Sequence, residues 1–288
     1  SGALDNTIRF YDQAAPEFST HQDLTHLVSD LNAEKIKLLI IDDSNPVYAL
    51  PHSMGFLKAM KKAFVVSLAS QKSETTHAAN LVLPTLTAYE SWGDAFPRAG
   101  VRSIQQPVMS TVNTFDAKAR EDILLSAAQS ANEKAFPRNS NYLDYLQDVW
   151  SKIQREVGDE RNFDSFWINV LENGGIFEQS KYISTSLNRK VTSVKVNDPG
   201  MADRDGLTLL PTTSLLLGDG SGANKPWLQE VPNPMSQIVW DSWVEINPET
   251  AQKLGINDRA IVEITTPHGS VQATAYYHFG IHRKAISI

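Results

Sequence analysis

Residues 243–275 read WVEINPETAQKLGINDRAIVEITTPHGSVQATA, and this stretch decides the fold of the C-terminal part of the chain. Trp243–Ile246 predicts a short strand. Asn247 and Pro248 follow it with the residue types typical of a helix N-cap and of the first helical position. Gly255 predicts the end of that helix, because glycine readily adopts the left-handed conformation at a helix C-terminus. The stretch therefore begins with a strand that leads directly into a short helix.

A strand pair ends the same stretch. Residues 260–265 and 270–277 flank a turn at Pro267–Gly269, which predicts a β-hairpin. Residues 285–288 are expected to begin another strand, and residues 207–217 to form a strand pair or one bent strand. These elements predict a compact β-rich domain over residues 206–288.

A glycine-rich loop lies inside this predicted domain. Its three glycines within five residues begin at Gly218 and give a flexible segment whose backbone amides can face a ligand. The candidate ligand-binding residues of this loop are Asp219, Gly220, Ser221, Gly222 and Asn224.

The first part of the chain, residues 1–130, has the pattern of an α/β layer. A helical stripe precedes three apolar runs at residues 37–43, 64–69 and 80–84. The first run is continuous, which predicts a strand buried on both faces. Strands that alternate with helices predict a parallel sheet with right-handed crossovers. The residues of the helical stripe are Leu24, Leu27, Val28 and Leu31.

Small polar residues follow the first two predicted strands. In a parallel sheet, ligands bind beyond the carboxyl ends of the strands, and Ser44, Asn45 and Pro46 stand at the first of these ends. Ser67 and Glu74 are the candidates around the second strand. The alternative interpretation is that such residues only form turns and helix caps, and for any single one of them this is the favoured reading. Neither GxGxxG nor a P-loop is present.

The helices that follow are expected to serve packing. Residues 116–128 predict a helix with Ile123, Leu124 and Ala127 facing inward. The middle region, residues 131–205, is expected to contain a linker, two amphipathic helices (142–157 and 162–172) and an extended connector. The aromatic stripe of the second helix favours core packing over a partner-binding face. His77 is interpreted as a surface helix residue, because it has no second ligand one turn away.

Composition excludes several classes of function. The 288 residues carry a net charge of −7, which argues against nucleic acid as a partner, because phosphate binding needs clustered lysine and arginine. The sequence has no cysteine, so this chain alone supplies no iron–sulfur cluster, disulfide or zinc thiolate. No apolar run reaches the roughly 18 residues of a membrane span. Neither a catalytic residue nor a metal ligand can be named from the sequence.

Residues 243–275 resemble the dinucleotide-binding module that ends the molybdopterin oxidoreductase family. The shared pattern is a strand, N-P-x-x-A, L-G-I, an acidic turn and a strand pair. One departure is visible at Asn257-Asp258-Arg259, where the family usually has a glycine before the acid. The first part resembles the α/β domain that precedes the module in this family. Its matching positions are Asn45-Pro46, Glu74-Thr75-x-x-Ala78, Leu83-Pro84 and Glu90-x-x-Gly93.

The resemblance implies an α/β parallel-sheet domain, a helical segment and a C-terminal double-psi β-barrel. It also implies that the chain is a fragment of a longer oxidoreductase, most similar to the molybdopterin-like iron–sulfur subunit of alternative complex III. Molybdopterin guanine dinucleotide would then be held in the full-length protein. Ser44, Asn45 and Pro46 would flank its phosphates, Ser67 and Glu74 would lie near its ribose or base, and the Asp219–Asn224 loop would face a pterin or guanine.

Two functions remain open after this comparison. The chain either contributes the cofactor-binding half of a respiratory molybdenum oxidoreductase, or it is a cofactor-less structural and electron-transfer scaffold in a quinol-oxidising membrane complex. The expected partners are the N-terminal domains of the parent protein and the iron–sulfur and quinol-interacting membrane subunits. The resemblance implies a peripheral location on the periplasmic side of the cytoplasmic membrane. The chain alone is not expected to be catalytic.

Overall fold

The computed structural model describes residues 10–11, 19–112, 115–132, 141–178, 182–183, 206–218, 220 and 222–288. The chain divides into two compact units. The N-terminal unit comprises Ser1–Asp43, Leu57–Lys72 and Thr76–Val191, and the C-terminal unit comprises Ser44–Phe56, Ser73–Thr75 and Thr192–Ile288. Two short segments that follow strands of the predicted α/β layer thus belong with the C-terminal unit. The domain boundaries near residues 130 and 205 stay a prediction.

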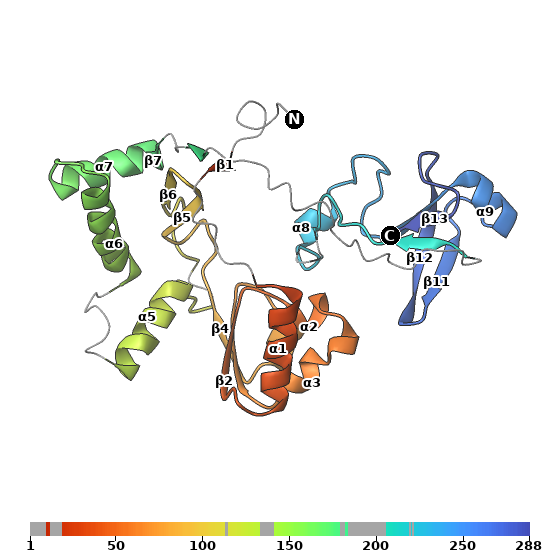
Figure 1. Ribbon diagram of the computed structural model, residues 1–288, viewed down its shortest axis with the longest axis horizontal. Coiled ribbons are helices and arrows are strands. Elements are labelled where there is room, and N and C mark those ends of the chain that lie inside the picture. Colours follow the sequence, from red (N-terminus) through yellow and green to blue (C-terminus); the bar gives the residue numbers. More distant parts are fainter. Residues whose placement is uncertain are drawn as a thin grey trace. The chain divides into compact units, whose positions relative to one another are not determined.

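The α/β layer of the N-terminal unit is a three-stranded parallel sheet in the order β2-β3-β4, and Figure 1 labels its outer strands β2 and β4 together with α1. The three predicted apolar runs form its strands, and the helical stripe forms α1, in which Val28 and Leu31 are buried. Thr20 caps α1 in a capping box with Asp23. The elements are α1 (His21–Asn32), β2 (Leu38–Asp42), α3 (Phe56–Met60), β3 (Phe64–Ala69), α4 (Glu74–Ala78) and β4 (Leu81–Pro84).

The first strand is not buried on both faces, as the continuous apolar run predicted. Leu38 is 55% exposed, and its register partner Phe64 on the neighbouring strand is 52% exposed. Ile41, whose side chain points to the opposite face, is 6% exposed. The strand order advances in one direction, so right-handed crossovers put both connecting helices on the same face. The apolar run at residues 37–43 therefore predicted a strand correctly, but it did not predict that only one face of this strand is covered.

The helix α5 (Arg120–Ala131) also differs from the prediction. It begins four residues later than expected, and Leu124 and Ala127 are exposed rather than inward. Its apolar residues Ile123, Leu124 and Leu125 are consecutive, so they cannot form a single stripe on a helix.

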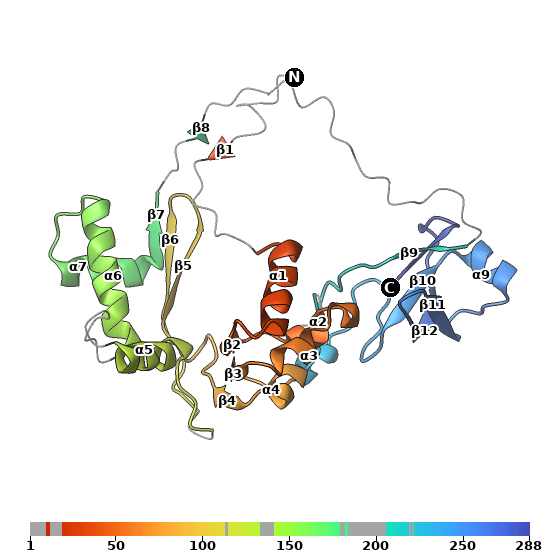
Figure 2. The ribbon, with the colours of Figure 1, turned by 60° about the horizontal axis from the view of Figure 1, so that its bottom comes forward.

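A second part of the N-terminal unit combines an antiparallel sheet with two helices (Figure 2). The predicted aromatic stripe lies in its core, where Phe166 is 2% and Trp167 8% exposed, so the core-packing interpretation is confirmed. The β5–β6 hairpin was not among the elements predicted from the sequence. The elements are β5 (Gly93–Arg98), β6 (Val101–Gln105), α6 (Tyr142–Glu156), α7 (Phe163–Asn173) and β7 (Gly175–Phe177). A further pair is formed by β1 (Phe10–Tyr11) and β8 (Tyr182–Ile183), and most of the predicted connector lies outside the described residues.

The C-terminal unit contains a mixed five-stranded sheet in the order β11-β12-β10-β13-β9. Strand β10 pairs in parallel with β12 and antiparallel with β13. The elements are α2 (Pro46–Ala49), the 3-10 helix η1 (His52–Met54), β9 (Thr208–Leu210), α8 (Pro226–Gln229), β10 (Trp243–Ile246), α9 (Pro248–Leu254), β11 (Ile261–Thr266), β12 (Gly269–Tyr277) and β13 (Ala285–Ser287). Among the described residues of both units, no helix has the length and apolar character to cross a membrane.

The deciding stretch folds as predicted. The Asn247 side chain accepts from the Glu249 backbone N–H at 3.0 Å, Pro248 begins α9, and Gly255 ends it with a φ of 69°. The hairpin β11–β12 is confirmed, and the core of the unit forms around Val244 and Ile246. Upstream, only Thr208–Leu210 of the predicted strand region forms a strand, and Ser214 pairs with Gly218 in an isolated bridge.

Candidate functional site

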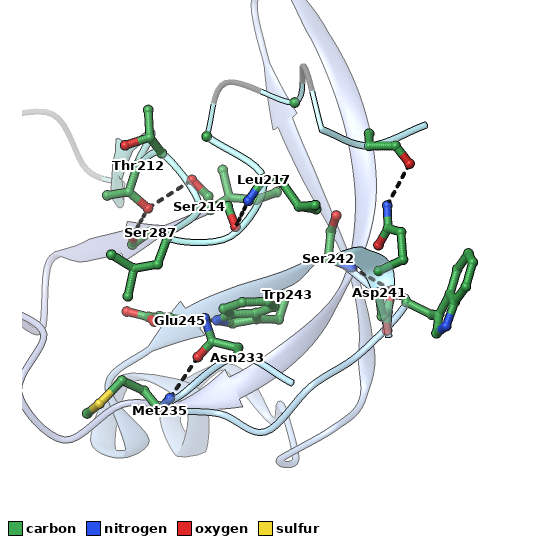
Figure 3. Close-up of a pocket in the computed structure, with 18 of the residues that line it drawn as sticks. Thr212, Ser214, Leu217, Asn233, Met235, Asp241, Ser242, Trp243, Glu245 and Ser287 are labelled. Carbon is green, nitrogen blue, oxygen red and sulfur yellow. Dashed lines mark hydrogen bonds between the residues drawn. The ribbon is translucent and has the colours of Figure 1, made fainter. Parts of the chain in front are cut away.

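A cavity of about 660 Å³ lies within the C-terminal unit (Figure 3). Its wall comes from segments far apart in the sequence: α2, the turn after β9, the stretch before β10, β10 itself and β13. The lining residues used below are Tyr48, Thr212, Ser214, Gly220, Asn233, Trp240, Asp241, Trp243, Glu245 and Ser287.

Strand alternation positions the central residues of this cavity. Val244 and Ile246 of β10 are 2% and 3% exposed and belong to the core. Successive side chains on a strand point to opposite faces, so Trp243 and Glu245 face the cavity. Ser287 is the antiparallel register partner of Glu245 and lines the same cavity.

One wall is formed by the close approach of Tyr48 to the glycine-rich loop. A Cβ atom added at Gly220 would lie 2.7 Å from the Tyr48 ring, and Gly220 has a φ of +92°. Both observations require glycine at this position. Gly220, a predicted site residue, therefore lines the cavity.

The other predicted residues of this loop have different positions. Gly222 is packed against Leu228, which would lie 2.8 Å from an added Cβ. Asn224 is exposed in a turn and does not line the cavity. Asp219 and Ser221 lie outside the described residues.

Several polar groups of the lining are bonded within the protein. The hydroxyls of Thr212 and Ser287 are 3.2 Å apart. The Ser214 hydroxyl accepts from the Leu216 and Leu217 backbone N–H groups at 3.3 and 3.2 Å. Asn233 Oδ1 accepts from two backbone N–H groups at 2.9 Å each. These bonds fix the backbone of the surrounding loops.

The charge of the lining is acidic. Asp241 and Glu245 contribute carboxylates, and no lysine, arginine or histidine is present among the described lining residues. The rings of Tyr48, Trp240 and Trp243 add aromatic surface. Such a lining suits a flat ring that donates hydrogen bonds.

The predicted residues after the first strand form a separate hydrogen-bonded group. The Asn45 side chain donates to Glu74 Oε2 at 2.7 Å, and its Oδ1 accepts from the Thr75 N–H and hydroxyl at 3.2 and 2.7 Å. Thr75 is fully buried and accepts from the Val47 N–H at 3.2 Å. We call Asn45, Glu74 and Thr75 the Asn45 cluster. It ties the two short segments of the C-terminal unit together.

The structure places the remaining predicted residues apart from one another. Ser44 is exposed, and Pro46 is half-buried at the start of α2. Ser67 lies on β3 in the N-terminal unit, is 1% exposed, and its hydroxyl has no hydrogen-bond partner among the described residues. Sequence reasoning missed Tyr48, Trp243 and Glu245, although the alternation in WVEI was a signal for the last two.

A group of titratable residues in the N-terminal unit serves packing. Asp94 accepts from the Trp150 indole N–H at 3.2 Å, and burial raises the pKa of this carboxyl. Burial, with the nearby charges of Asp94 and Glu121, raises the pKa of Tyr142 to about 12. Among the described residues, no cluster of three or more histidine, aspartate or glutamate side chains could hold a metal ion.

A mixed sheet whose central strand directs an aromatic ring and a carboxylate into a cavity makes the C-terminal unit a domain with a ligand-sized pocket. Comparison with known proteins gives the particular family. Residues 227–288 match the family described as Molydopterin dinucleotide binding domain. The chain is therefore related to the molybdopterin oxidoreductases, and the matched residues include Trp240, Trp243 and Glu245 of the cavity.

One curated protein is similar to this chain in sequence, and one solved structure is similar in fold. The menaquinone reductase, molybdopterin-binding-like subunit of Nitratidesulfovibrio vulgaris (strain Hildenborough) is 24% identical over 275 residues, which cover 93% of this chain and 38% of that protein. Acetylene hydratase from Pelobacter acetylenicus has a similar fold, with a TM-score of 0.57 and 18% identity over 92% of this chain and 39% of the other. The chain thus spans about two-fifths of the length of each.

The described residues fit one part of a pterin dinucleotide better than the rest. The aromatic rings and carboxylates of the cavity suit a heterocycle with N–H donors, such as guanine or pterin. A diphosphate usually binds lysine, arginine or free backbone amides, and the described lining offers neither cation. The cavity therefore fits the heterocyclic end of the cofactor.

Proposed function

We propose that this chain supplies the dinucleotide-binding part of a molybdopterin oxidoreductase subunit in a respiratory complex, with the cavity holding a heterocyclic end of the cofactor. The observation that carries the proposal is the pair Trp243 and Glu245, which face the cavity side by side from β10 within the matched domain. The cofactor, when bound, supplies the redox chemistry of the parent protein.

The residues of the chain bind and orient the heterocycle in this proposal. Trp240, Trp243 and Tyr48 provide aromatic surface for a flat ring. Glu245 accepts hydrogen bonds from ring N–H groups. Gly220 keeps the adjacent loop close to Tyr48 without a steric clash. The Asn45 cluster holds the segment that carries Tyr48.

We further propose that residues 206–288 form a double-psi β-barrel. The mixed order of the sheet supports this, because β10 lies between one parallel and one antiparallel neighbour. An experimental structure of the parent protein tests the proposal, and an open sheet without crossed connections would contradict it.

The biological setting of the parent protein is also a proposal. Its N-terminal domains, an iron–sulfur subunit and a quinol-interacting membrane subunit are the proposed partners, as in an assembly of the alternative complex III type. The name of the Nitratidesulfovibrio relative, a subunit of a menaquinone reductase, supports a respiratory complex. A peripheral position on the periplasmic side of the cytoplasmic membrane follows from this setting, and protease accessibility in spheroplasts tests it.

The decisive experiment is a cofactor analysis of the full-length parent protein. We expect about one molybdenum per chain by mass spectrometry of the metals, together with release of guanine nucleotide on acid hydrolysis. Iron without molybdenum and without released nucleotide would overturn the proposal.

One observation favours a second function, that of a cofactor-less structural and electron-transfer scaffold. The predicted phosphate-binding residue Asn45 uses its side chain within the protein, and the described cavity lining offers no cation to a diphosphate. The same cofactor analysis separates the two functions, because molybdenum near one atom per chain would exclude the scaffold.

A further inference from the structure

Glu245 and Asp241 are the two carboxylates of the lining, and they differ in how strongly their oxygens are bonded within the protein. Asp241 accepts from the Ser242 backbone N–H and from the Thr274 hydroxyl, both at 2.8 Å. Glu245 Oε1 has only a long contact of 3.4 Å from the Trp243 indole N–H among the described residues. An ionised carboxylate has about four accepting positions. Each of the two carboxylates therefore keeps accepting positions, and Glu245 Oε1 is the oxygen whose bond within the protein is the longest.

The second oxygen of Glu245 is held by a residue outside the lining. His278 Nδ1 lies 2.7 Å from Glu245 Oε2. An ionised carboxylate only accepts hydrogen bonds, so Nδ1 must carry the proton and donate it. His278 follows the end of β12 and is 47% exposed, whereas Glu245 is 29% exposed. The histidine thus reaches the carboxylate from the solvent side.

The backbone fixes the position of His278 from two directions. Its N–H donates to the Ile246 carbonyl at 3.0 Å, beside the end of β10. A Cβ added at Gly280 would lie 3.2 Å from His278 Nε2, so the backbone of the following turn approaches the far edge of the ring. The backbone bond fixes the start of the His278 side chain, and the Gly280 backbone limits the space beside the far edge of its ring.

We propose that His278 is a positioning residue that fixes the Glu245 carboxylate so that Oε1 faces the cavity for a ligand with ring N–H donors. A free glutamate side chain loses rotamer freedom when a ligand binds, and a side chain held in advance loses less. The inference rests on the proposed function and extends it to a residue that does not touch the ligand. The expected ligand of Glu245 is a purine or a pterin that presents an edge with adjacent N–H groups.

The first test needs no ligand. The indole ¹⁵N–¹H signal of Trp243, assigned with W243F in the full chain, reports whether Glu245 Oε1 stays beside this ring. We expect His278→Ala to shift that signal and His278→Asn, which retains a donor near the Nδ1 position, to restore it. His268→Ala, in the β11–β12 turn, is the matched control and should leave the signal unchanged. An unchanged signal in His278→Ala would overturn the positioning role.

The second test measures guanosine binding by calorimetry. It uses the original chain and the His278→Ala, His278→Asn and His268→Ala variants. We expect His278→Ala to weaken binding about fivefold, because the Glu245 side chain then loses its rotamer freedom when the ligand binds, and His278→Asn to stay within about threefold of the original chain. Equal loss in both variants, with a lowered thermal midpoint, would show a merely structural role and overturn the proposal. A Trp243 shift without any guanosine binding would uphold the positioning and overturn the ligand assignment.

Discussion

Two groups of polar side chains in the C-terminal unit use their hydrogen-bonding atoms differently. In the Asn45 cluster, the amide of Asn45 bonds to Glu74 and Thr75, and the Thr75 hydroxyl bonds onward to Val47. In the cavity lining, Glu245 Oε1 has a 3.4 Å contact from the Trp243 indole N–H, while His278 holds Oε2. Polar residues after a parallel strand can thus bond to one another within the protein, whereas strand alternation turns a residue of a mixed sheet toward a cavity.

The largest expected effect is a loss of folding stability when the Asn45 cluster is disrupted. Asn45→Ala removes the acceptor for the Thr75 N–H and hydroxyl, and Thr75 is fully buried. Buried donors without a partner are costly, so we expect a loss of about 2 to 3 kcal/mol in the free energy of unfolding. Urea denaturation measures it. A stable variant with lost ligand binding would instead make Asn45 a ligand-binding residue and remove the contrast between the two groups.

The next effect concerns binding at Glu245 and should leave stability almost intact. Glu245→Gln replaces an accepting oxygen by a donor, so we expect guanosine binding to weaken by about 1.4 kcal/mol, or about tenfold. The partly exposed pair with His278 is worth at most about 1 kcal/mol to folding. Calorimetry and thermal unfolding on the same samples separate the two quantities. Asp241→Asn is the matched control, because the Asp241 oxygens are bonded within the protein.

A smaller effect on stability and binding is expected at Gly220, where the glycine-rich loop approaches Tyr48. Gly220→Ala adds a methyl group that would lie 2.7 Å from the Tyr48 ring, at a backbone φ of +92°. We expect a loss of about 1 kcal/mol in stability from the backbone conformation alone and weaker guanosine binding. The double variant with Tyr48→Ala should remove the clash but keep the backbone cost. Equal stability of the single and double variants would show that the clash is relieved elsewhere.

The smallest expected effect concerns Glu90, another residue of the family pattern whose carboxylate is hydrogen-bonded within the protein. Hydrogen bonds from the Val112 backbone N–H, then from the Thr87 backbone N–H and hydroxyl, lower the pKa of Glu90. A lowered pKa adds stability above the unfolded pKa, and this stability is lost as the pH falls through the folded pKa. Glu90→Gln should therefore flatten the acid side of the stability curve measured by urea denaturation between pH 3 and pH 7 (about the range in which a glutamate titrates). An unchanged acid limb would contradict the structural role of Glu90.

Local sequence signals predicted most of the elements. Asn247, Pro248 and Gly255 gave the bounds of α9, because capping and left-handed glycine depend on residues close in sequence. The hairpin β5–β6 was not among the strands predicted from the sequence, because Gly93–Arg98 and Val101–Gln105 form no continuous apolar run. The consecutive apolar residues of α5 led to an inward face that the helix does not have.

The candidate site was predicted only in part. The glycine-rich loop was identified from its composition, and Gly220 does line a cavity. Tyr48 could not be assigned to that cavity, because 172 positions separate it from Gly220 (220 minus 48) and no local pattern links them. Ser67 was selected for its position near a strand end, but strand alternation buries its side chain, which leaves it 1% exposed.

The sequence by itself determined the relation to the molybdopterin oxidoreductases and the strand–helix–hairpin of residues 243–277, since both depend on residue order over short distances. Only the tertiary structure decided which polar groups bond to one another and which face a cavity. The physical reason is that hydrogen-bond partners such as Asn45 and Thr75, or Glu245 and His278, are 30 and 33 positions apart, and their meeting depends on how the strands and turns between them pack.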